Sequence, residues 1–258
     1  MSVLGIILAG GNGTRLSPMT QIISKQLLPI YNKPMIYYPL ANLMLSDIKR
    51  YVIVVKSDQY HHYFNLLGNG SALGIEIDYV FQDQPKGIAD AISLCDSYIE
   101  DQFVLALGDN FLYGAGLQCL FQDIIRSKKA TIFGCNVKNP EAFGVAIVDK
   151  QGKLLEIREK EVEPASNLAV PGYYFLDRKA VEYASNINLS DRGEYEIADV
   201  LNAYARQDDL CLQVLGRGFL WYDTGTFKDL LTVSNFVQNT EETTQSRIGD
   251  VFEIAGRW

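Results

Sequence analysis

The chain has 258 residues, of which 48% are hydrophobic and 21% are charged, a composition that excludes a disordered, collagen-like or coiled-coil protein. At roughly 100–200 residues per domain, this length corresponds to one large domain or two small ones. The 31 acidic and 23 basic residues give a formal net charge of −8, which disfavours general binding to nucleic acid or to an anionic membrane. Any phosphate that the chain binds must therefore meet a local group of cations.

The first residues and the cysteines indicate the cellular compartment. The start MSVLGIILAGG has no basic leading region and runs directly into a glycine loop, so we interpret it as a core strand rather than a signal peptide. No stretch approaches the ~18 apolar residues of a membrane-spanning helix. The four cysteines show no CxxC spacing, so we expect neither a zinc site nor a disulfide framework, and we expect a cytoplasmic protein.

Short apolar runs alternate with amphipathic segments along the chain, beginning with a strand, helix and strand at residues 5–9, 34–46 and 50–55. This alternation predicts an α/β fold with a Rossmann-like, mixed but mainly parallel sheet flanked by helices. Further helices are expected at residues 61–67, 88–98, 114–127, 178–184, 196–207 and 227–240. Further strands are expected at residues 75–81, 103–107, 131–137, 144–148, 154–159, 170–175 and 210–215, with a strand end or loop at 221–226. Without a linker or repeat, we expect one continuous domain.

The first chemical signal is a glycine loop, LAGGNGTR at residues 8–15, directly after the first strand. Glycines allow backbone N–H groups to approach a phosphate closely and to form an anion-binding nest. The loop alone can also be a tight turn without a ligand, because the P-loop pattern is absent and the last glycine of GxGxxG would fall at Leu16. Arg15 and Lys25 add two cations that can neutralise a triphosphate. Together these features predict a nucleotide site.

Two aspartates follow apolar segments in comparable positions. Asp109 comes after the run at residues 103–107, at the carboxyl end of a strand, where α/β sheets bind their ligands. Asp223 lies in the turn WYDTGT at residues 221–226. An aspartate at a strand end, taken alone, is about as often a helix cap or turn former as a metal ligand. Two carboxylates together with phosphate oxygens, however, are the ligands that Mg²⁺ uses in nucleotidyl transfer.

The stretch GIILAGGNGTRLSPMTQIISKQLLPIYNKPMIYYPL resembles the N-terminal signature of the sugar-1-phosphate nucleotidylyltransferases, most closely the glucose-1-phosphate thymidylyltransferases. Matching stretches continue in order at residues 81–82, 87–91, 107–110, 143–145, 159–160, 193–197 and 221–226. The resemblance covers essentially the whole chain. It implies the nucleotidyltransferase fold, with a nucleotide-binding half at about 1–135, a sugar-binding half at about 136–240 and a short C-terminal tail, assembled as a homotetramer or homodimer.

The reaction that the resemblance implies is Mg²⁺-dependent attack of α-D-glucose 1-phosphate on the α-phosphorus of dTTP, giving dTDP-glucose, a precursor in deoxysugar biosynthesis, and pyrophosphate. The nucleophile is already an anion, so catalysis consists of aligning two anionic substrates and offsetting their repulsion. The resemblance implies catalytic roles for Arg15, Lys25, Asp109, Lys160 and Asp223. Of these, Asp109 and Asp223 would meet around one metal ion.

The resemblance also implies the binding residues. Those for the nucleotide are Leu8, Gly10, Gly11, Gly13, Thr14, Arg15, Gln82, Gly87 and Asp109. Those for the sugar phosphate are Asn110, Gly144, Glu159, Lys160, Val170, Tyr174, Glu196 and Trp221. A glutamine such as Gln82 can pair with a pyrimidine edge as donor and acceptor, although a buried or capping glutamine is the alternative. Lys160 can likewise be a solvated residue at a charged strand end, and Tyr174 and Trp221 can be core aromatics.

Substrate preference stays open at this stage. Asp83, Lys86 and Asp90 stand where typical thymidylyltransferases carry Pro, Asp and Gln, so UTP or another sugar 1-phosphate is an alternative. A non-catalytic nucleotide-sugar sensor is a second alternative. A nicotinamide dehydrogenase is disfavoured because the glycine fingerprint is incomplete and no acidic residue follows the loop by about 20 positions.

Overall fold

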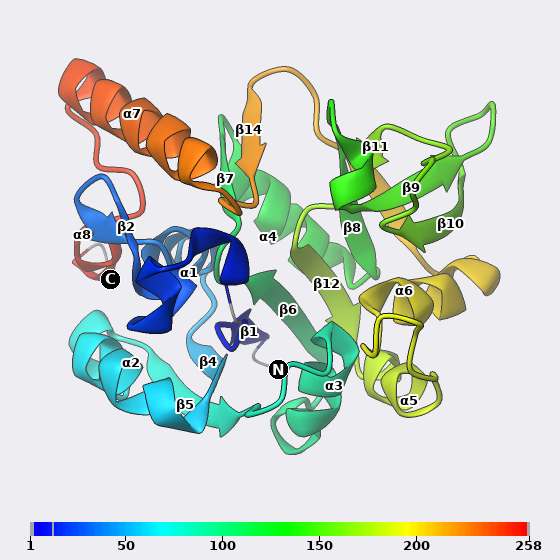
Figure 1. Ribbon diagram of the computed structural model, residues 1–258, viewed down its shortest axis with the longest axis horizontal. Coiled ribbons are helices and arrows are strands. Elements are labelled where there is room, and N and C mark those ends of the chain that lie inside the picture. The colour runs from blue at the N-terminus through cyan, green and yellow to red at the C-terminus, as the bar shows by residue number, and fades with distance from the viewer. Residues whose placement is uncertain (1–2, 12, 257–258) are drawn as a thin grey trace.

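A mixed sheet of ten strands runs through the molecule (Figure 1). The computed structural model describes residues 3–11 and 13–256. The parallel block consists, in spatial order, of β6 (Gln102–Leu107), β1 (Leu4–Leu8), β4 (Arg50–Val55) and β5 (Glu76–Phe81). Beyond β6, the sheet continues through β12 (Tyr173–Asp177), β8 (Thr131–Asn136), β11 (Leu168–Ala169), β9 (Gly144–Val148) and β10 (Leu154–Glu159), with β13 (Cys211–Val214) parallel to β8. The predicted fold class is confirmed.

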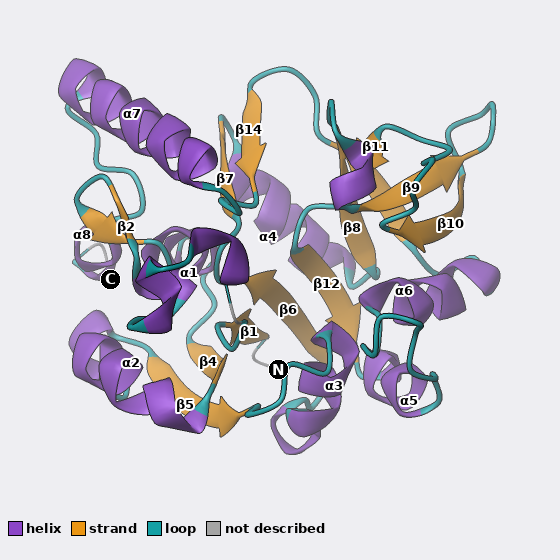
Figure 2. Ribbon diagram, in the orientation of Figure 1, coloured by secondary structure: helices purple, strands orange, loops and turns teal. Residues whose placement is uncertain are grey.

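Helices cover both faces of this sheet (Figure 2). One face packs against α1 (Tyr37–Met44), α2 (Tyr60–Leu67), α4 (Leu117–Ser127) and α8 (Val251–Ala255). The other face packs against α3 (Ile88–Leu94), α5 (Lys179–Ser185) and α6 (Ile197–Arg206). The long helix α7 (Phe227–Thr244) forms a third apolar cluster with the segment that follows the glycine loop. No helix in the described residues is long and apolar enough to span a bilayer.

The central strands are apolar along their whole length because both faces of the sheet are covered. Ile6 and Ile7 of β1 are neighbours in sequence, and both are fully buried, yet they belong to the cores on opposite faces. Successive side chains of a strand point to opposite faces, so a strand covered on both sides needs a continuous apolar run. This is why LGIIL predicts a core strand so clearly.

A separate ladder pairs β7 (Phe111–Gly114) with β14 (Phe219–Tyr222). This pairing was not predicted from the sequence. The predicted helix over residues 114–127 was wrong at its start, because Gly114 ends β7 and α4 begins at Leu117. A Cβ on Gly114 would lie 2.3 Å from the Phe219 ring, so the glycine permits the two strands to approach.

Several other predicted boundaries were also wrong. The helix predicted at 34–46 begins only at Tyr37, because Lys33–Pro34 forms a short ladder with Pro29–Ile30. The helix predicted at 88–98 ends at Leu94 and a 3-10 turn follows. The strand predicted at 170–175 begins at Tyr173, since Pro171 has no N–H to donate to a ladder. The helix α8 was not predicted.

Candidate active site

The parallel register of two central strands places the glycine loop beside the first aspartate. Leu8 of β1 pairs with Leu107 of β6, and the backbone N–H of Gly108 donates to the carbonyl of Leu8 at 2.9 Å. Both chains therefore leave the same edge of the sheet, one into Gly10 and the other into Asp109. Ligands of open α/β sheets bind at this edge.

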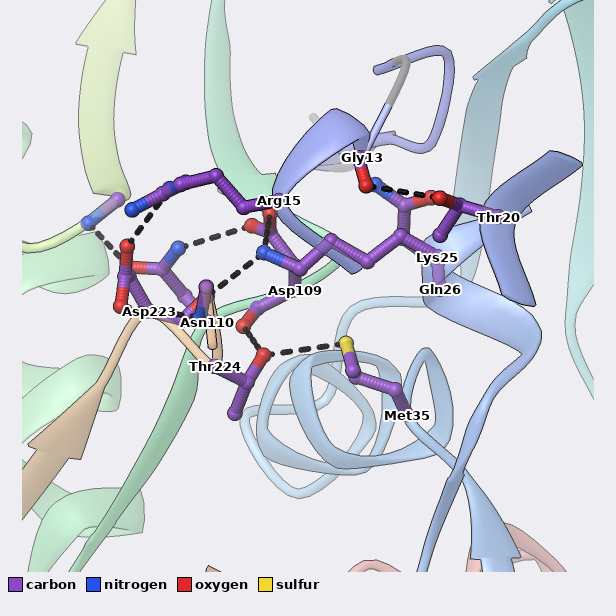
Figure 3. Close-up of polar contacts among 12 residues, drawn as sticks. Gly13, Arg15, Thr20, Lys25, Gln26, Met35, Asp109, Asn110, Asp223 and Thr224 are labelled. Atoms are coloured by element: carbon purple, nitrogen blue, oxygen red, sulfur yellow. Dashed lines mark hydrogen bonds and ion pairs between the residues drawn. The ribbon is translucent and has the colours of Figure 1, made fainter. Parts of the chain in front are cut away.

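The glycine loop is fixed by a close approach at Gly13. This residue has a φ of +58°, and a Cβ on it would lie 2.9 Å from Cγ2 of Thr20 and 3.1 Å from Cβ of Lys25. The Thr20 hydroxyl donates to the Gly13 carbonyl at 2.8 Å (Figure 3). Asn12, the remaining member of the loop, lies outside the described residues. A side chain at position 13 would displace Lys25, so the loop conformation and the position of this lysine are coupled.

Lys25 is a buried cation with a relative exposure of 6%. Its Nζ lies 2.7 Å from Oδ2 of Asp109 and donates to the backbone carbonyl of Asp223 at 3.0 Å (Figure 3). A buried charge is tolerated only when it is paired and hydrogen-bonded. The lysine therefore ties the end of β6 to the distant turn at residue 223.

The ladder between β7 and β14 brings Asp223 to this position. Tyr222 pairs with Phe111, so the chain enters residue 223 beside Asp109. The buried Thr224 donates from Oγ1 to the Asp109 carbonyl at 2.6 Å. On its exposed side, Oδ2 of Asp223 lies 3.3 Å from a guanidinium nitrogen of Arg15 (Figure 3). The predicted catalytic residues of the nucleotide side thus form one connected group.

The two carboxylates fit a divalent cation that takes further ligands from its substrate. Asp109 accepts from Lys25 through one oxygen and from Asn110 Nδ2, at 3.0 Å, through the other. Asp223 accepts from Arg15 and, at 3.2 Å, from the Gly225 N–H. Both side chains remain about a fifth exposed, at 23% and 22%, and a carboxylate has about four acceptor positions. No group of three or more Cys, His, Asp or Glu able to hold a metal occurs in the described residues.

The predicted nucleotide residues line two adjoining pockets. The first, of about 340 Å³, contains Gly11, Gly13, Thr14 and Arg15 together with Lys25 and Asp109. The second, of about 210 Å³, contains Leu8, Gly10, Gly11, Gln82 and Gly87, again with Asp109. The cations stand in the first pocket, which suits the phosphates, whereas the second has the mixed apolar and amide lining that suits a base.

The turn at Gly87 connects the second pocket to a distant segment. Gly87 has a φ of +101°, and a Cβ on it would lie 2.4 Å from the carbonyl oxygen of Tyr195. The Tyr195 N–H donates to the Lys86 carbonyl at 2.7 Å, and the Ala89 N–H donates to the Tyr195 carbonyl at 3.3 Å. Only glycine fits this contact without strain. The segment around Tyr195 is therefore held against the turn that lines the second pocket.

All eight predicted sugar-phosphate residues line one pocket of about 220 Å³, which also contains Arg15, Asp109 and Asp223. Asn110 is buried and holds its walls together: its Oδ1 accepts from the Gly172 N–H at 2.9 Å and from Trp221 Nε1 at 2.7 Å. The indole of Trp221 packs on Phe143 with ring centroids 5.0 Å apart. These contacts make Asn110 and Trp221 parts of a rigid pocket wall.

Charged residues gather at one side of this pocket. Burial raises the pKa of Glu159, although the neighbouring Lys160 and Arg192 oppose the shift. Nζ of Lys160 lies 3.4 Å from Glu159, and Lys160 has a φ of +45°. Arg192 contacts Glu159 at 3.5 Å and Glu196 at 3.2 Å. The pocket therefore offers carboxylate acceptors for hydroxyl groups and cations for a phosphate.

Residues 4–240 match the model of a protein family described as nucleotidyl transferase. The glucose-1-phosphate thymidylyltransferase of Neisseria meningitidis is 44% identical over 255 residues, covering 98% of this chain and 88% of the relative. The enzyme of that name from Mycobacterium tuberculosis is 44% identical over 254 residues, with the same coverage. The chain belongs to the nucleotidyl transferase family, among the glucose-1-phosphate thymidylyltransferases.

Two solved structures share the fold of this chain. A Bacillus anthracis protein provisionally named a glucose-1-phosphate thymidylyltransferase superposes with a TM-score of 0.86 at 33% identity, covering 98% of this chain and 99% of that one. A UDP-glucose pyrophosphorylase superposes with a TM-score of 0.81 at 23% identity, covering 93% and 100%. The second likeness shows the fold alone.

Three residues of this chain that line or border the pockets were not predicted from the sequence. Gln26 lines both nucleotide-side pockets, and Glu194 lines all three. Arg192 contacts three glutamates of the sugar side. Gln26 directly follows Lys25, and Glu194 lies in the matching stretch 193–197, so position within the motifs was the available signal. Arg192 had no such signal.

Proposed function

We propose that the chain transfers a thymidylyl group from dTTP to α-D-glucose 1-phosphate, giving dTDP-glucose and pyrophosphate. The observation that carries this proposal is that Asp109, held by the buried Lys25, lines the phosphate, base and sugar pockets alike. Two substrates that occupy these adjoining pockets meet at one carboxylate and its cation. The names of the relatives supply the identity of the base and the sugar.

The reaction proceeds by direct displacement. A phosphate oxygen of the sugar phosphate forms a bond to the α-phosphorus as the bond to the β-phosphate oxygen breaks, and pyrophosphate leaves with the electron pair. Arg15 and Lys25 offset charge on the triphosphate, and Lys160 binds the sugar phosphate. Such positioning and charge compensation account for most phosphoryl-transfer catalysis.

We propose a single displacement without a covalent nucleotidyl-enzyme, because the sugar phosphate already carries an anionic nucleophile. The described lining residues of the three pockets include no cysteine, histidine or serine. Lys25, the buried amine nearest Asp109, is engaged by that carboxylate at 2.7 Å.

Asp109 and Asp223 would hold the divalent ion, which we propose to be Mg²⁺. When bound, it would offset negative charge on the triphosphate and on the departing pyrophosphate. Arg15 keeps Asp223 oriented toward the site, and Lys25 does the same for Asp109.

We also propose how substrate binding is divided along the chain and how the chain assembles. We assign nucleotide binding mainly to residues 1–135 and sugar binding mainly to residues 136–240, and we place the protein in the cytoplasm as a homotetramer or homodimer. Light scattering after size exclusion distinguishes the oligomers from a monomer.

A substrate matrix tests the function. Pyrophosphate release is measured with Mg²⁺ for dTTP, UTP, CTP, ATP and GTP against glucose, galactose and mannose 1-phosphates, with product mass confirmed. The highest kcat/KM is expected for dTTP with glucose 1-phosphate. A higher kcat/KM for another pair of nucleotide and sugar phosphate would reassign the specificity. Binding without turnover for every pair would support a nucleotide-sugar sensor.

A further inference from the structure

The amide of Gln82 has one chemically consistent orientation. Its nitrogen lies 2.7 Å from a carboxylate oxygen of Asp90 and 3.1 Å from the carbonyl oxygen of Gly87. Both partners only accept hydrogen bonds, so the NH₂ group must face them and the amide oxygen must face away. An exchanged amide would place three oxygens against one another.

The free oxygen of Gln82 belongs to the base pocket. No hydrogen bond to this oxygen occurs within residues 3–11 and 13–256. A Cβ on Gly10 would lie 3.9 Å from it, and Gly10 and Gln82 line the same pocket of about 210 Å³. The pocket therefore presents an acceptor, with the donor half of the amide directed at Asp90.

The carboxylate of Asp90 has no other hydrogen bond in the described part of the chain. Gly87 contributes the second acceptor, a neutral backbone carbonyl in the turn that is held against Tyr195. A hydrogen bond to a charged group is stronger than one to a neutral carbonyl. Asp90 is thus the stronger of the two contacts that orient the amide.

We propose that Asp90 is a positioning residue for base selection, which fixes Gln82 as a hydrogen-bond acceptor and so favours bases that carry a ring N–H. This inference rests on the proposed function, because it requires the nucleotide base to occupy this pocket. Thymine and uracil carry a hydrogen on N3 and can donate to the amide oxygen. Cytosine has a lone pair on N3, which would face that oxygen unfavourably.

Two nucleotide preferences should respond differently to the loss of Asp90. The preference for dTTP over CTP depends on the orientation of Gln82, whereas the preference for dTTP over UTP does not, because both bases offer the same N3–H. Removing Asp90 should therefore change the first ratio of dissociation constants and leave the second unaltered. If Asp90 served only as an acidic residue in the first turn of α3, its removal would change the affinities for dTTP, UTP and CTP alike and leave both ratios unaltered.

Calorimetric titration of dTTP, UTP and CTP without sugar phosphate measures both ratios in the absence of turnover. For Asp90→Ala we expect the preference for dTTP over CTP to fall about tenfold, the effect of losing one charge-assisted hydrogen bond. Asp90→Asn keeps an acceptor oxygen and should retain most of the preference. Asp83→Ala is the matched control, since Asp83 accepts from the Ser57 N–H instead of from Gln82.

The outcomes are distinguishable. An unaltered preference for dTTP over CTP in a folded Asp90→Ala protein, verified by thermal melting, would overturn the inference and leave the proposed function intact. An equal loss in Asp83→Ala would also overturn it, because any nearby negative charge would then suffice. Equal binding of dTTP and CTP by the unsubstituted protein would contradict the proposed substrate and this inference together.

Discussion

Nζ of Lys25 lies 2.7 Å from Oδ2 of Asp109, so a buried cation and the aspartate common to all three pockets form one unit. The two residues come from different parts of the chain: Lys25 begins a 3-10 turn after the glycine loop, and Asp109 follows β6. The same ammonium group donates to the carbonyl of Asp223. Charge compensation at the site thus depends on a side chain that the fold holds in place before substrate arrives.

Lys25→Met keeps most of the length of the side chain, which becomes one heavy atom shorter, and removes its charge. We expect kcat to fall by about 10²–10³-fold, as for the loss of a preorganised electrostatic contact in other active sites. Steady-state rates with thermal melting measure this, and Lys153→Met, on an exposed ion pair with Asp208, serves as control. A rate within tenfold of the unsubstituted protein would contradict the role.

Asp109→Asn and Asp223→Asn should weaken metal binding, because each replaces a charged oxygen donor with a neutral amide. We expect maximal rates to fall by about 100-fold or more and half-maximal activity to require more Mg²⁺. A Mg²⁺ titration of each variant measures both quantities. An unchanged Mg²⁺ requirement in both variants would contradict the assignment of metal binding to these aspartates.

Lys160→Ala should act on one substrate only. Losing a charge-assisted contact to the sugar phosphate should raise the KM for glucose 1-phosphate about tenfold or more, with little change in the KM for dTTP. Initial rates over a grid of both substrates separate these constants. Equal increases in both KM values would argue for a general distortion instead.

Gly87→Ala tests the contact between the base-side turn and Tyr195. The new Cβ would lie 2.4 Å from the Tyr195 carbonyl at a φ of +101°, so we expect a loss of about 1–3 kcal/mol in the free energy of unfolding. Gly193→Ala is the matched control, with a φ of +73° and no atom within 4 Å of the new Cβ. Chemical denaturation compares the two, and a smaller loss for Gly87→Ala than for Gly193→Ala would contradict the clash.

Glu159 should make stability depend on pH. Burial raises its pKa in the folded state above the ordinary value of 4.5, so the folded protein holds this proton more tightly than the unfolded chain. The stability contribution is therefore greatest below pH 4.5 and is lost as pH rises through the folded pKa. The Tm of Glu159→Gln minus the Tm of the unsubstituted protein should therefore increase as pH rises through this range. Parallel Tm curves from pH 4 to 8 would show that the folded pKa is not raised.

The sequence predicted the central strands well because they are covered on both faces, as Ile6 and Ile7 show. It did not predict the pairing of β7 with β14, since two four-residue strands about a hundred positions apart carry no local signal for one another. The position of Asp109 after a strand was visible from the pattern. Its link to Asp223 through Lys25 was expected only from the family resemblance, because the position of residue 223 depends on the unpredicted ladder.

The partners of the site residues were harder to predict than the residues themselves. Gln82 was expected to read a base, but its fixed orientation depends on Asp90, which the sequence analysis noted only as a departure. Arg192 was missed because its three glutamate contacts join segments that only the folded chain brings together. Side-chain pairing of this kind has no periodicity in the sequence.

Isotope exchange tests most directly the claim that two substrates react by displacement in adjoining pockets. Labelled pyrophosphate is incubated with the protein, dTTP and Mg²⁺, with or without glucose 1-phosphate, and label in dTTP is measured. The account predicts exchange only when glucose 1-phosphate is present, because the α-phosphorus has no acceptor on the protein. Exchange at a comparable rate without the sugar phosphate would show a covalent nucleotidyl-enzyme and contradict direct displacement.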